Sequence, residues 1–292
     1  MRNIFCAVVV TFNPDPDAFF GLQSDLVAED IPYVVVDNGS IRKPNALNAE
    51  LVIWNDQNLG LGAALNAGIG AVKQRGYPNA LLLDQDSRLL RGFSAGMRRA
   101  MAEVDALGVN FSAVGPMLRN PETYKDQSFR SVNRLFSRKS RRVAGAKGLY
   151  LADFLITSGT VLPLDAYAEI GQMREDYFID NIDLEWCFRA QSKGYQAYGT
   201  NYCKLLHRIG EGHSNVLVRR GWVSLHAPNR IYYSTRNRFH LYRQPYAGWL
   251  WKLRDFSRFL LKTSVLLMVS KQRKNYFKNI IAGLRDAQEL DN

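Results

Sequence analysis

Short apolar runs alternate with helix-like segments through the first half of the chain. The runs are rich in valine, isoleucine and leucine and occupy residues 7–12, 33–40, 51–55, 80–87 and 112–118. Residues 59–74 have the small-residue content of a helix packed close to a sheet, and another helix is expected near residues 92–106. This alternation predicts an α/β fold with a mostly parallel central sheet and flanking helices. Further along, residues 150–164 predict a pair of strands, and an amphipathic helix is expected near residues 182–193.

Polar side chains follow several of these strands at the same end. They are Thr11 and Asn13, Asp37 and Asn38, Asn55 and Asn58, and Asp84 and Asp86. Ligands of open parallel sheets bind beyond the carboxyl ends of the strands. Four strand ends that carry polar groups therefore predict one binding site along this edge of the sheet.

Asp84 and Asp86 end an apolar strand in the sequence LLLDQDS, on either side of Gln85. A buried carboxylate is costly unless it is paired or bound to a metal. Two carboxylates here fit Mg²⁺ or Mn²⁺, with waters and phosphate oxygens as the remaining ligands. His207 follows a later candidate strand and could complete the site through an imidazole nitrogen. The alternatives are an Asx-type turn for the acids and a structural role for the histidine.

Asp37 follows three valines and precedes a Gly-Ser turn. This position suits hydrogen bonds to a ribose or a base edge. Turn chemistry is an equal alternative, because Asp-Asn-Gly is a strong turn former. The glycines of NLGLGAALNAG lack the GxGxxG spacing, so a dinucleotide-dependent redox enzyme is only weakly supported.

Three acids, Asp180, Asp183 and Glu185, occur where the amphipathic helix near residue 182 is expected to begin. Asp180 as the N-cap and Asp183 as the third helical residue would both suit the helix dipole. A carboxylate in a first helical turn opposite a metal–phosphate site is also a candidate general base, and we assign that role to Asp183. Glu185 is either structural or acceptor-binding. Neighbouring aromatic side chains, among them Trp186, would raise a carboxylate pKa or line a sugar site.

Composition limits the class of protein. The 292 residues are 47% hydrophobic and 22% charged, as in an ordinary globular protein of one large or two modest domains. Cys6, Cys187 and Cys203 form no CxxC pair, which favours reduced thiols in a cytosolic setting. The apolar N-terminal stretch is expected to be the first strand and not a signal peptide. No apolar run approaches the roughly 20 residues that span a bilayer, so we expect no integral membrane protein.

Positive charge is concentrated in the last third of the chain. Residues 200–292 hold 17 Lys and Arg against 5 Asp and Glu, whereas the formal net charge of the whole chain is +11. This asymmetry favours an anionic partner, such as phosphate groups, a lipid surface or nucleic acid. We therefore expect a catalytic domain over residues 1–205 and a basic helical extension over residues 206–292.

Two stripes run along the expected helix of the extension. Trp249, Leu253, Phe256, Leu260 and Leu267 repeat at helical spacing, and Arg254, Arg258 and Lys262 form a separate basic stripe. This combination predicts a helix that lies in an anionic membrane interface. The alternative is that the apolar stripe packs on the catalytic domain and the charges are solvated.

The chain resembles family 2 glycosyltransferases over roughly residues 5–240, with the motifs VVVTFNPD, VVDNGS, NLGLGAALNAGI, LLLDQDS, ITSG and FIDNIDLEWCFRA in that order. Its DQDS and FIDNIDLEWCFRA segments look most like bacterial rhamnosyltransferases of surface-polysaccharide (O-antigen) assembly. The resemblance implies a Rossmann-like A-type glycosyltransferase fold, a divalent metal and inverting transfer from a nucleotide sugar, with dTDP-L-rhamnose favoured. It also implies a polyprenyl-diphosphate-linked glycan acceptor and a cytoplasmic enzyme, peripheral on the inner face of the plasma membrane.

The resemblance also assigns roles by position. The nucleotide and donor contacts would be Thr11, Asn13, Asp37, Asn38, Asn58, Asp84, Gln85 and Arg236. The metal ligands would be Asp86 and His207, and the acceptor contacts Ser158, Glu185 and Trp186. The base would be Asp183 or Asp180, because Ile182 stands where many relatives carry an acid.

Two other classes of function stay open. The basic tail could bind nucleic acid, but no nucleic-acid motif occurs and the acidic strand ends would repel a polyanion. We therefore expect no nucleic-acid partner. A nucleotidyltransferase would also use paired acids and a metal, and it would release pyrophosphate where a glycosyltransferase releases a nucleoside diphosphate.

Overall fold

The computed structural model describes residues 4–131, 138–207, 228–270 and 272–290. The strands are β1 (Cys6–Thr11), β2 (Tyr33–Asp37), β3 (Leu51–Trp54), β4 (Asn79–Asp84), β5 (Arg88–Leu89), β6 (Phe111–Arg119), β7 (Arg130–Ser131), β8 (Arg138–Lys139), β9 (Leu149–Ala152), β10 (Thr160–Pro163) and β11 (Gln196–Leu206). The helices are α1 (Pro16–Ala28), α2 (Leu61–Gln74), α3 (Phe93–Asp105), α4 (Leu164–Ile170), α5 (Ile182–Ser192), α7 (Pro228–Arg243), α8 (Trp249–Val269) and α9 (Arg273–Asp286).

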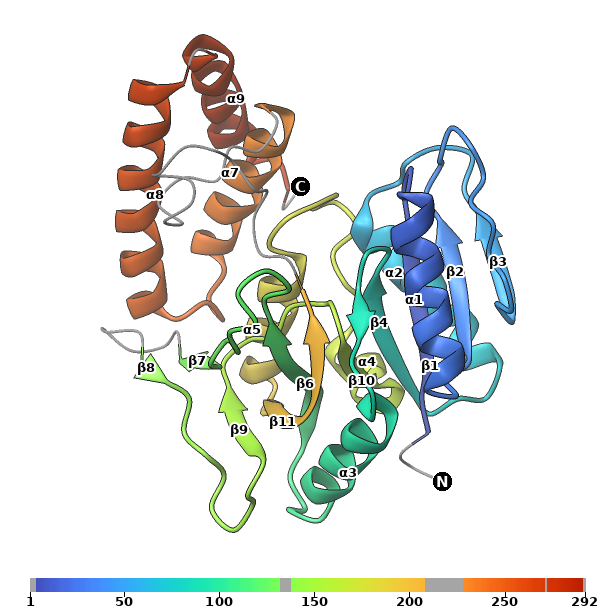
Figure 1. The fold of residues 1–292 in the computed structure, drawn as a ribbon. Helices are drawn as coiled ribbons and strands as arrows, with labels where there is room; N and C mark the ends of the chain where they lie inside the picture. Colours follow the sequence, from blue (N-terminus) through green and yellow to red (C-terminus); the bar gives the residue numbers. More distant parts are fainter. Residues whose placement is uncertain (1–3, 132–137, 208–227, 271, 291–292) are drawn as a thin grey trace.

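One mixed sheet of nine strands dominates the described residues (Figure 1). Its order is β3-β2-β1-β4-β10-β6-β11-β5, with β9 paired to β11, and β7 pairs separately with β8. Strands β1 to β4 are parallel to one another, as the alternating sequence pattern predicts. The other half is mixed, because β10 is antiparallel to both of its neighbours.

The strand pair expected in residues 150–164 does not form, although both strands exist. β9 pairs with β11, and β10 inserts between β4 and β6. The local pattern shows where each strand lies, but it carries no information about a partner that is distant in the sequence. The expectation of two strands is confirmed, and the expectation that they pair is wrong.

Helices cover both faces of the sheet. On one face, Leu22 of α1 and Met97 of α3 pack with Val9 of β1. On the other face, Ile69 of α2 and Trp186 of α5 pack with Val8. Successive strand residues point to opposite faces of a sheet, so a strand that is covered on both sides needs an unbroken apolar run. This requirement explains the continuous valines and leucines that end in the polar groups of the site.

Helix α2 lies close against the sheet, as its small residues predict. A Cβ atom added at Gly68 would lie 2.2 Å from Cγ1 of Val8, a distance at which the helix would have to move away. At its N-terminus, Gly60 has a φ of +91°, and a Cβ atom there would meet Phe178 at 2.8 Å. The glycines of this helix therefore serve packing, against β1 at one point and against the segment before α5 at another.

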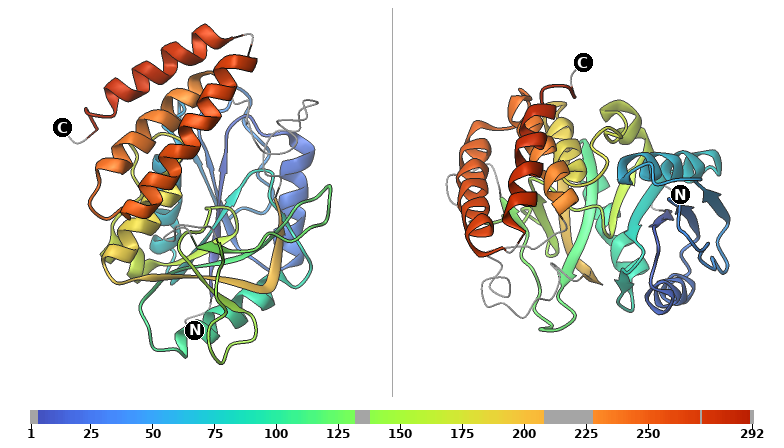
Figure 2. Two further views of the ribbon diagram at one scale, coloured as in Figure 1. Left: turned by 90° about the vertical axis from the view of Figure 1, so that its left-hand side faces the viewer. Right: turned by 90° about the horizontal axis from the view of Figure 1, so that it is seen from above.

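Helices α7, α8 and α9 gather beside the sheet, on the side away from β3 (Figure 2). Helices α7 and α9 approach closely, because a Cβ atom at Gly283 would lie 2.7 Å from the carbonyl oxygen of Tyr232. Among the described helices, none is long and apolar enough to cross a membrane. Residues 208–227 lie outside the described residues, so the domain boundary expected after residue 205 stays a prediction. The three cysteines are buried and unpaired, as expected for reduced thiols.

Candidate functional site

The first polar group of the site joins the ends of β1 and β2. Thr11 donates its hydroxyl to Asp37 Oδ1 at 2.9 Å. Ser40 donates to the same carboxylate through its hydroxyl at 2.6 Å and its backbone N–H at 3.0 Å. Thr11 and Asp37 are 0% and 2% exposed. Both oxygens of Asp37 therefore accept hydrogen bonds that fix the turn after β2, as the turn-chemistry alternative predicts. A nucleotide that bonded Asp37 would have to share these oxygens.

Asn38 organises the loop that leads into α2. Its Nδ2 donates to Asn58 Oδ1 at 2.9 Å and to the Gly60 carbonyl at 3.2 Å. Its Oδ1 accepts from Asn55 Nδ2 and from the Leu59 N–H, each at 3.0 Å. The structure thus brings together the asparagines that follow β2 and β3, as their positions at the strand ends predict.

Asn13 and Gln85 tie the neighbouring loops to this rim. The Asn13 N–H donates to Ser40 Oγ at 2.7 Å, and Asn13 Oδ1 accepts the Ile41 N–H at 2.9 Å. Gln85 Oε1 accepts the Phe12 N–H at 2.7 Å. The loops after β1, β2 and β4 therefore form one connected edge, where the nucleotide-binding residues were expected.

Asp84 ends β4 and is buried enough that its pKa is raised. The hydrogen bond that it accepts from the Ser158 hydroxyl opposes this rise, as does the nearby charge of His207. The charge of Asp86 adds to the rise in the pKa of Asp84. Ser158 is 2% exposed, so its hydroxyl supports Asp84 from below. The predicted contact of Ser158 with an acceptor stays a prediction.

The residues expected to bind a metal are only partly assembled. Among the residues that the structure describes, no three His, Cys, Asp or Glu side chains form a group that could hold a metal ion. Asp86 is exposed beside the half-buried Asp84. Carboxylate oxygens are the donors that Mg²⁺ and Mn²⁺ prefer, and these ions keep waters and phosphate oxygens as further ligands. The two aspartates therefore fit such an ion, whereas the described geometry does not assemble His207 with them as a third ligand.

The backbone that leads into α5 is strained. Phe178, Asp180 and Asn181 have φ angles of 61°, 66° and 61°, in the left-handed region that non-glycine residues avoid. Such a conformation costs on the order of 1–3 kcal/mol per residue and persists only where surrounding contacts enforce it. Helix α5 then begins at Ile182 with Asn181 as its N-cap, and no side chain caps it. Asp180 as the N-cap is therefore wrong, because the chain takes one more residue to enter the helix.

Asp180 is instead held by an arginine of α7. Arg230 Nη2 lies 2.9 Å from Asp180 Oδ1, and Arg230 Nε lies 3.2 Å from both carboxylate oxygens. Two guanidinium nitrogens therefore already occupy the oxygens of this carboxylate, in the two-pronged geometry of a strong Arg–carboxylate pair. Of the two acids that the sequence left open as the base, the geometry favours Asp183.

Asp183 is the second residue of α5, not the third. Burial, together with the charges of Asp180 and Asp84, raises the pKa of its carboxyl to about 6. The hydrogen bond from the Leu184 N–H, at 2.8 Å, opposes this rise. A cavity beside the carboxyl is lined mainly by apolar side chains, Leu155 among them. The structure thus places Asp183 near Asp84, across the end of β4, with a pKa suited to a base at neutral pH.

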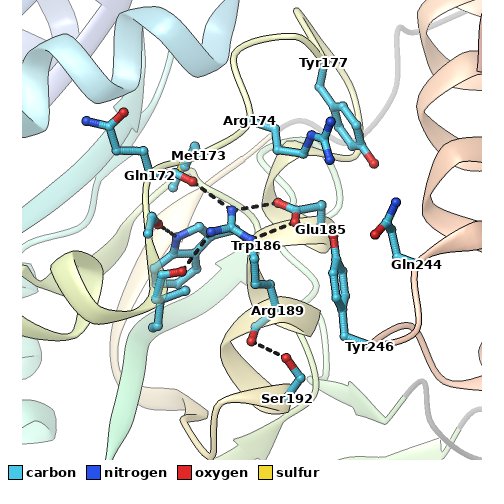
Figure 3. Close-up of polar contacts among 12 residues, drawn as sticks. Gln172, Met173, Arg174, Tyr177, Glu185, Trp186, Arg189, Ser192, Gln244 and Tyr246 are labelled. Carbon is cyan, nitrogen blue, oxygen red and sulfur yellow. Dashed lines mark hydrogen bonds and ion pairs between the residues drawn. The ribbon is translucent and has the colours of Figure 1, made fainter. Parts of the chain in front are cut away.

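Glu185 and Trp186 bond partners in the protein interior, and Figure 3 shows the Glu185 carboxylate beside Arg189 and Tyr246. Glu185 is 0% exposed and accepts from Arg189 Nε at 2.8 Å, Arg189 Nη2 at 2.9 Å and the Tyr246 hydroxyl at 2.8 Å. Trp186 is 1% exposed and donates its indole N–H to the Gly171 carbonyl at 2.9 Å. Glu185 is two residues after Asp183, so at 3.6 residues per turn it lies on roughly the opposite side of α5. These contacts favour the structural alternative for Glu185, and contact of Trp186 with the acceptor stays a prediction.

Arg236 of α7 contacts the segment that precedes α5. Its guanidinium donates to the Asp176 carbonyl and, at 3.1 Å, to Asn237 Oδ1. It also lies over the ring of Tyr233, 5.2 Å from the centroid. These contacts hold Arg236 against the segment before α5, and its predicted contact with a phosphate stays a prediction.

Two residues that contact the segment around Asp180, namely Arg230 and Asn237, are not predicted as site residues by the sequence. Arg230, which pairs with Asp180, gave no local signal. Asn237 had one, because it follows Arg236 in the segment YYSTRN on a helix whose neighbouring turns are aromatic. A polar residue on the buried side of such a helix signals a specific hydrogen-bond partner.

No protein-family model matches the chain. It is 27% identical to the dTDP-rhamnosyl transferase RfbF of Shigella flexneri over 290 residues. The matched region covers 98% of this chain and 96% of that protein. An uncharacterized protein of Mycobacterium tuberculosis is 26% identical over 192 residues, 64% of this chain and 67% of that protein.

Solved structures resemble the fold. Residues 1–349 of S. aureus TarS in complex with UDP-GlcNAc match with a TM-score of 0.58 and 13% identity, over 99% of this chain and 88% of that one. GalNAc-T7 with UDP, GalNAc and Mn²⁺ matches with a TM-score of 0.59 and 11% identity, over 98% of this chain and 56% of that one. At these identities the likeness shows the fold, which is the A-type glycosyltransferase fold that the motifs imply.

Proposed function

We propose that this chain, which is a glycosyltransferase with the A-type fold, moves a sugar from a nucleotide donor to a hydroxyl of a growing bacterial surface glycan, with inversion. L-Rhamnose from dTDP-L-rhamnose is the favoured donor sugar, because the relative that matches nearly the whole chain is a dTDP-rhamnosyl transferase. A polyprenyl-diphosphate-linked glycan of O-antigen type is the favoured acceptor. The alternative is another nucleotide sugar, such as the UDP-GlcNAc that is bound in the TarS structure.

The observation that carries this proposal is the position of Asp183. It lies in the first turn of α5, close enough to Asp84 for their charges to interact, and burial raises its pKa to about 6. A carboxyl group with that pKa is mostly deprotonated at pH 7, and it is a stronger base than an ordinary aspartate. A donor whose phosphates lie at Asp84 and Asp86 would have its sugar between those acids and Asp183.

In this proposal, different residues of the chain bind the nucleotide and accept the proton. The rim of Thr11, Asn13, Asp37, Asn38, Asn58 and Gln85 would hold the nucleotide. Asp183 would accept the proton of the acceptor hydroxyl as that oxygen attacks the anomeric carbon from the face opposite the leaving group. A single displacement of this kind inverts the anomeric centre.

A divalent cation would be held by Asp86, with Asp84, and by the donor's diphosphate. When bound, Mg²⁺ or Mn²⁺ would neutralise charge on the departing nucleoside diphosphate. The Mn²⁺ and UDP of the GalNAc-T7 structure are consistent with this. The buried Ser158 would keep the Asp84 carboxyl in place through its hydrogen bond.

A panel of nucleotide sugars tests the proposal. The melting temperature of the protein is measured with dTDP-L-rhamnose, UDP-GlcNAc and GDP-mannose, each with Mn²⁺ and with EDTA. A ligand at 100 times its Kd should stabilise the folded state by about 2.7 kcal/mol, so we expect a clear rise with dTDP-L-rhamnose and Mn²⁺ alone. With an acceptor, the released product should be dTDP. Release of pyrophosphate from a nucleoside triphosphate would instead show a nucleotidyltransferase. Equal binding of dTDP-L-rhamnose in EDTA and in Mn²⁺ would show that donor binding does not require a metal.

The exposed face of α8 supports a membrane surface as a partner. Trp249, Leu253, Phe256 and Leu260 are 70%, 54%, 38% and 50% exposed, so the apolar stripe does not pack on the catalytic domain. The opposite face of the same helix, which includes Trp251, is buried. Contiguous apolar surface on a helix that also carries a basic stripe is typical of interfacial binding to anionic lipid. We therefore propose that the enzyme is peripheral on the inner face of the plasma membrane.

Vesicle sedimentation tests this surface. With vesicles containing phosphatidylglycerol we expect binding that weakens at high salt, because about 1 kcal/mol per basic residue comes from the surface potential. Replacing Leu253 and Phe256 with Ser should weaken binding about tenfold or more, since each buried side chain contributes roughly 1.5–3 kcal/mol. Phe20→Ser is the matched control, because Phe20 is 57% exposed on α1, far from α8 in the sequence. Unchanged binding of the Leu253 and Phe256 variant would exclude this face.

A further inference from the structure

A single side-chain amide of α7 contacts the strained turn that precedes Asp183. Asn237 Nδ2 lies 2.8 Å from the Tyr177 carbonyl oxygen, 2.8 Å from that of Ile179 and 2.9 Å from that of Asp180. Asn237 is 0% exposed. An NH₂ group has two hydrogens, so three carbonyls must share them. One amide nitrogen therefore binds three backbone carbonyls of the segment that leads into α5.

These carbonyls belong to the segment with left-handed backbone. Phe178, Asp180 and Asn181 have positive φ angles. The carbonyls of Tyr177, Ile179 and Asp180 bond Asn237, whereas the Phe178 carbonyl between them bonds the Leu61 N–H. Without a donor there, buried carbonyls would lose their hydrogen bonds, and the segment would have no reason to keep a conformation that side chains disfavour. The next residues are the N-cap and the first turn of α5, which carries Asp183.

Other contacts also hold this segment, among them the Arg230–Asp180 ion pair and a hydrogen bond from Asn181 Nδ2 to the Ser234 carbonyl at 3.4 Å. The Tyr177 hydroxyl lies 2.7 Å from His240 Nδ1, and the Phe178 ring stacks on Tyr233 at 4.8 Å between centroids. From the opposite side, the Leu61 N–H of α2 donates to the Phe178 carbonyl at 2.6 Å. Among the contacts described, Asn237 is the α7 side chain that binds the backbone carbonyls of Ile179 and Asp180, beside the residues with positive φ.

We propose that Asn237 is a positioning residue, which sets the place of the Asp183 carboxyl by fixing the turn before α5. This inference rests on the proposed role of Asp183 as the base. It also means that α7, although it belongs to the expected C-terminal extension, is part of the active-site structure. A shift of about 1 Å in a catalytic group costs on the order of 10²-fold in rate, so the turn does not have to unfold for the effect to be large.

Asn237→Asp tests the proposal, because it keeps the shape and removes the donors. We expect kcat to fall about 10²-fold while the Kd for the nucleotide sugar, measured without acceptor, stays within twofold. The acid limb of the kcat–pH profile should also move away from the value near 6 that Asp183 gives the wild type. A role limited to stability would lower the melting temperature and the yield but leave the pH profile of the folded protein unchanged.

A second variant keeps the test decisive if Asn237→Asp does not fold. Asn237→Ser retains one hydroxyl donor, and we expect an intermediate loss of kcat. Adding Asn181→Gly should restore part of that loss, because glycine adopts the left-handed conformation without steric cost. Asn279→Asp is the control for the chemical change, since the half-buried Asn279 of α9 bonds only its own helix in the contacts described.

The two levels of the proposal fail differently. If Asp183→Asn turns over normally, the base is wrongly assigned and the proposed function fails with it. If Asp183→Asn is inactive but folded Asn237→Asp and Asn237→Ser keep wild-type kcat and pH profile, only the positioning role of Asn237 is overturned.

Discussion

Asp183→Asn should reduce the rate of sugar transfer by about 10²–10⁴-fold, the usual contribution of a positioned general base. The amide keeps the size of the carboxyl but cannot accept the proton of the acceptor hydroxyl. Donor binding should be nearly unchanged, because the rim at β1, β2 and β4 is not altered. Steady-state kinetics gives the loss in kcat, and calorimetry with the nucleotide sugar gives its Kd.

The same variant should not be less stable than the wild type at neutral pH. The folded-state pKa of Asp183, about 6, lies above that of an unfolded aspartate, so folding favours the protonated form. Keeping this carboxyl charged costs stability as the pH rises from about 4 to about 6, and a neutral amide avoids that cost. Marked destabilisation of Asp183→Asn would mean that the loss of activity reflects unfolding and not a missing base.

The pH dependence of the wild type follows from the same group. Because the base works only when deprotonated, kcat should fall tenfold per pH unit below about 6 and level off above it. The pKa read from kcat refers to the enzyme with donor bound, whose phosphates would raise it further. A profile that is flat between pH 5 and 7 would contradict the assignment.

Arg189→Met should destabilise the fold by about 3–5 kcal/mol, because it leaves the buried carboxylate of Glu185 without its cation. Glu185 is 0% exposed, and Arg189 binds it through two nitrogens at 2.8 and 2.9 Å. The guanidinium also donates to the carbonyls of Ile170 and Gln172, at 2.9 and 2.8 Å, and of these two only Ile170 has a second described donor, Lys193. Urea unfolding at constant pH measures the loss as a shift in the midpoint.

Arg99→Met is the matched control for this prediction. Arg99 and Glu103 also form an Arg–Glu pair one helical turn apart, with Nε and Oε1 separated by 3.0 Å, but the arginine side chain is 59% exposed. Water replaces such a partner readily, so the midpoint should hardly move. If both variants unfold at the wild-type midpoint, the Glu185 site is solvated and its structural role is wrong.

Much of the fold follows from local sequence. The valines before Asp37 and the leucines before Asp84 predict buried strands, because a strand covered on both faces can carry no polar side chain until it leaves the sheet. For the same reason, the first polar residues mark the strand ends, and the rim of Thr11, Asn38 and Gln85 is found where these residues place it. The small residues before and within α2 likewise predict its close packing.

Other features depend on contacts between distant segments. The sequence from Asp180 to Trp186 shows three acids and an aromatic residue, all plausible at a site. Only tertiary structure separates them. An arginine 50 residues away binds Asp180, and the core encloses Glu185 and Trp186.

The sequence by itself determined the class of fold, the edge of the sheet where the polar groups meet and the candidate set of acids, because burial dictates residue type along each strand. Tertiary structure decided that β10 inserts between β4 and β6, that Asp183 has the raised pKa, and that Asn237 holds the turn before it. Partner choice between strands and desolvation of a carboxyl depend on which segments meet in space, and residue order does not encode that locally.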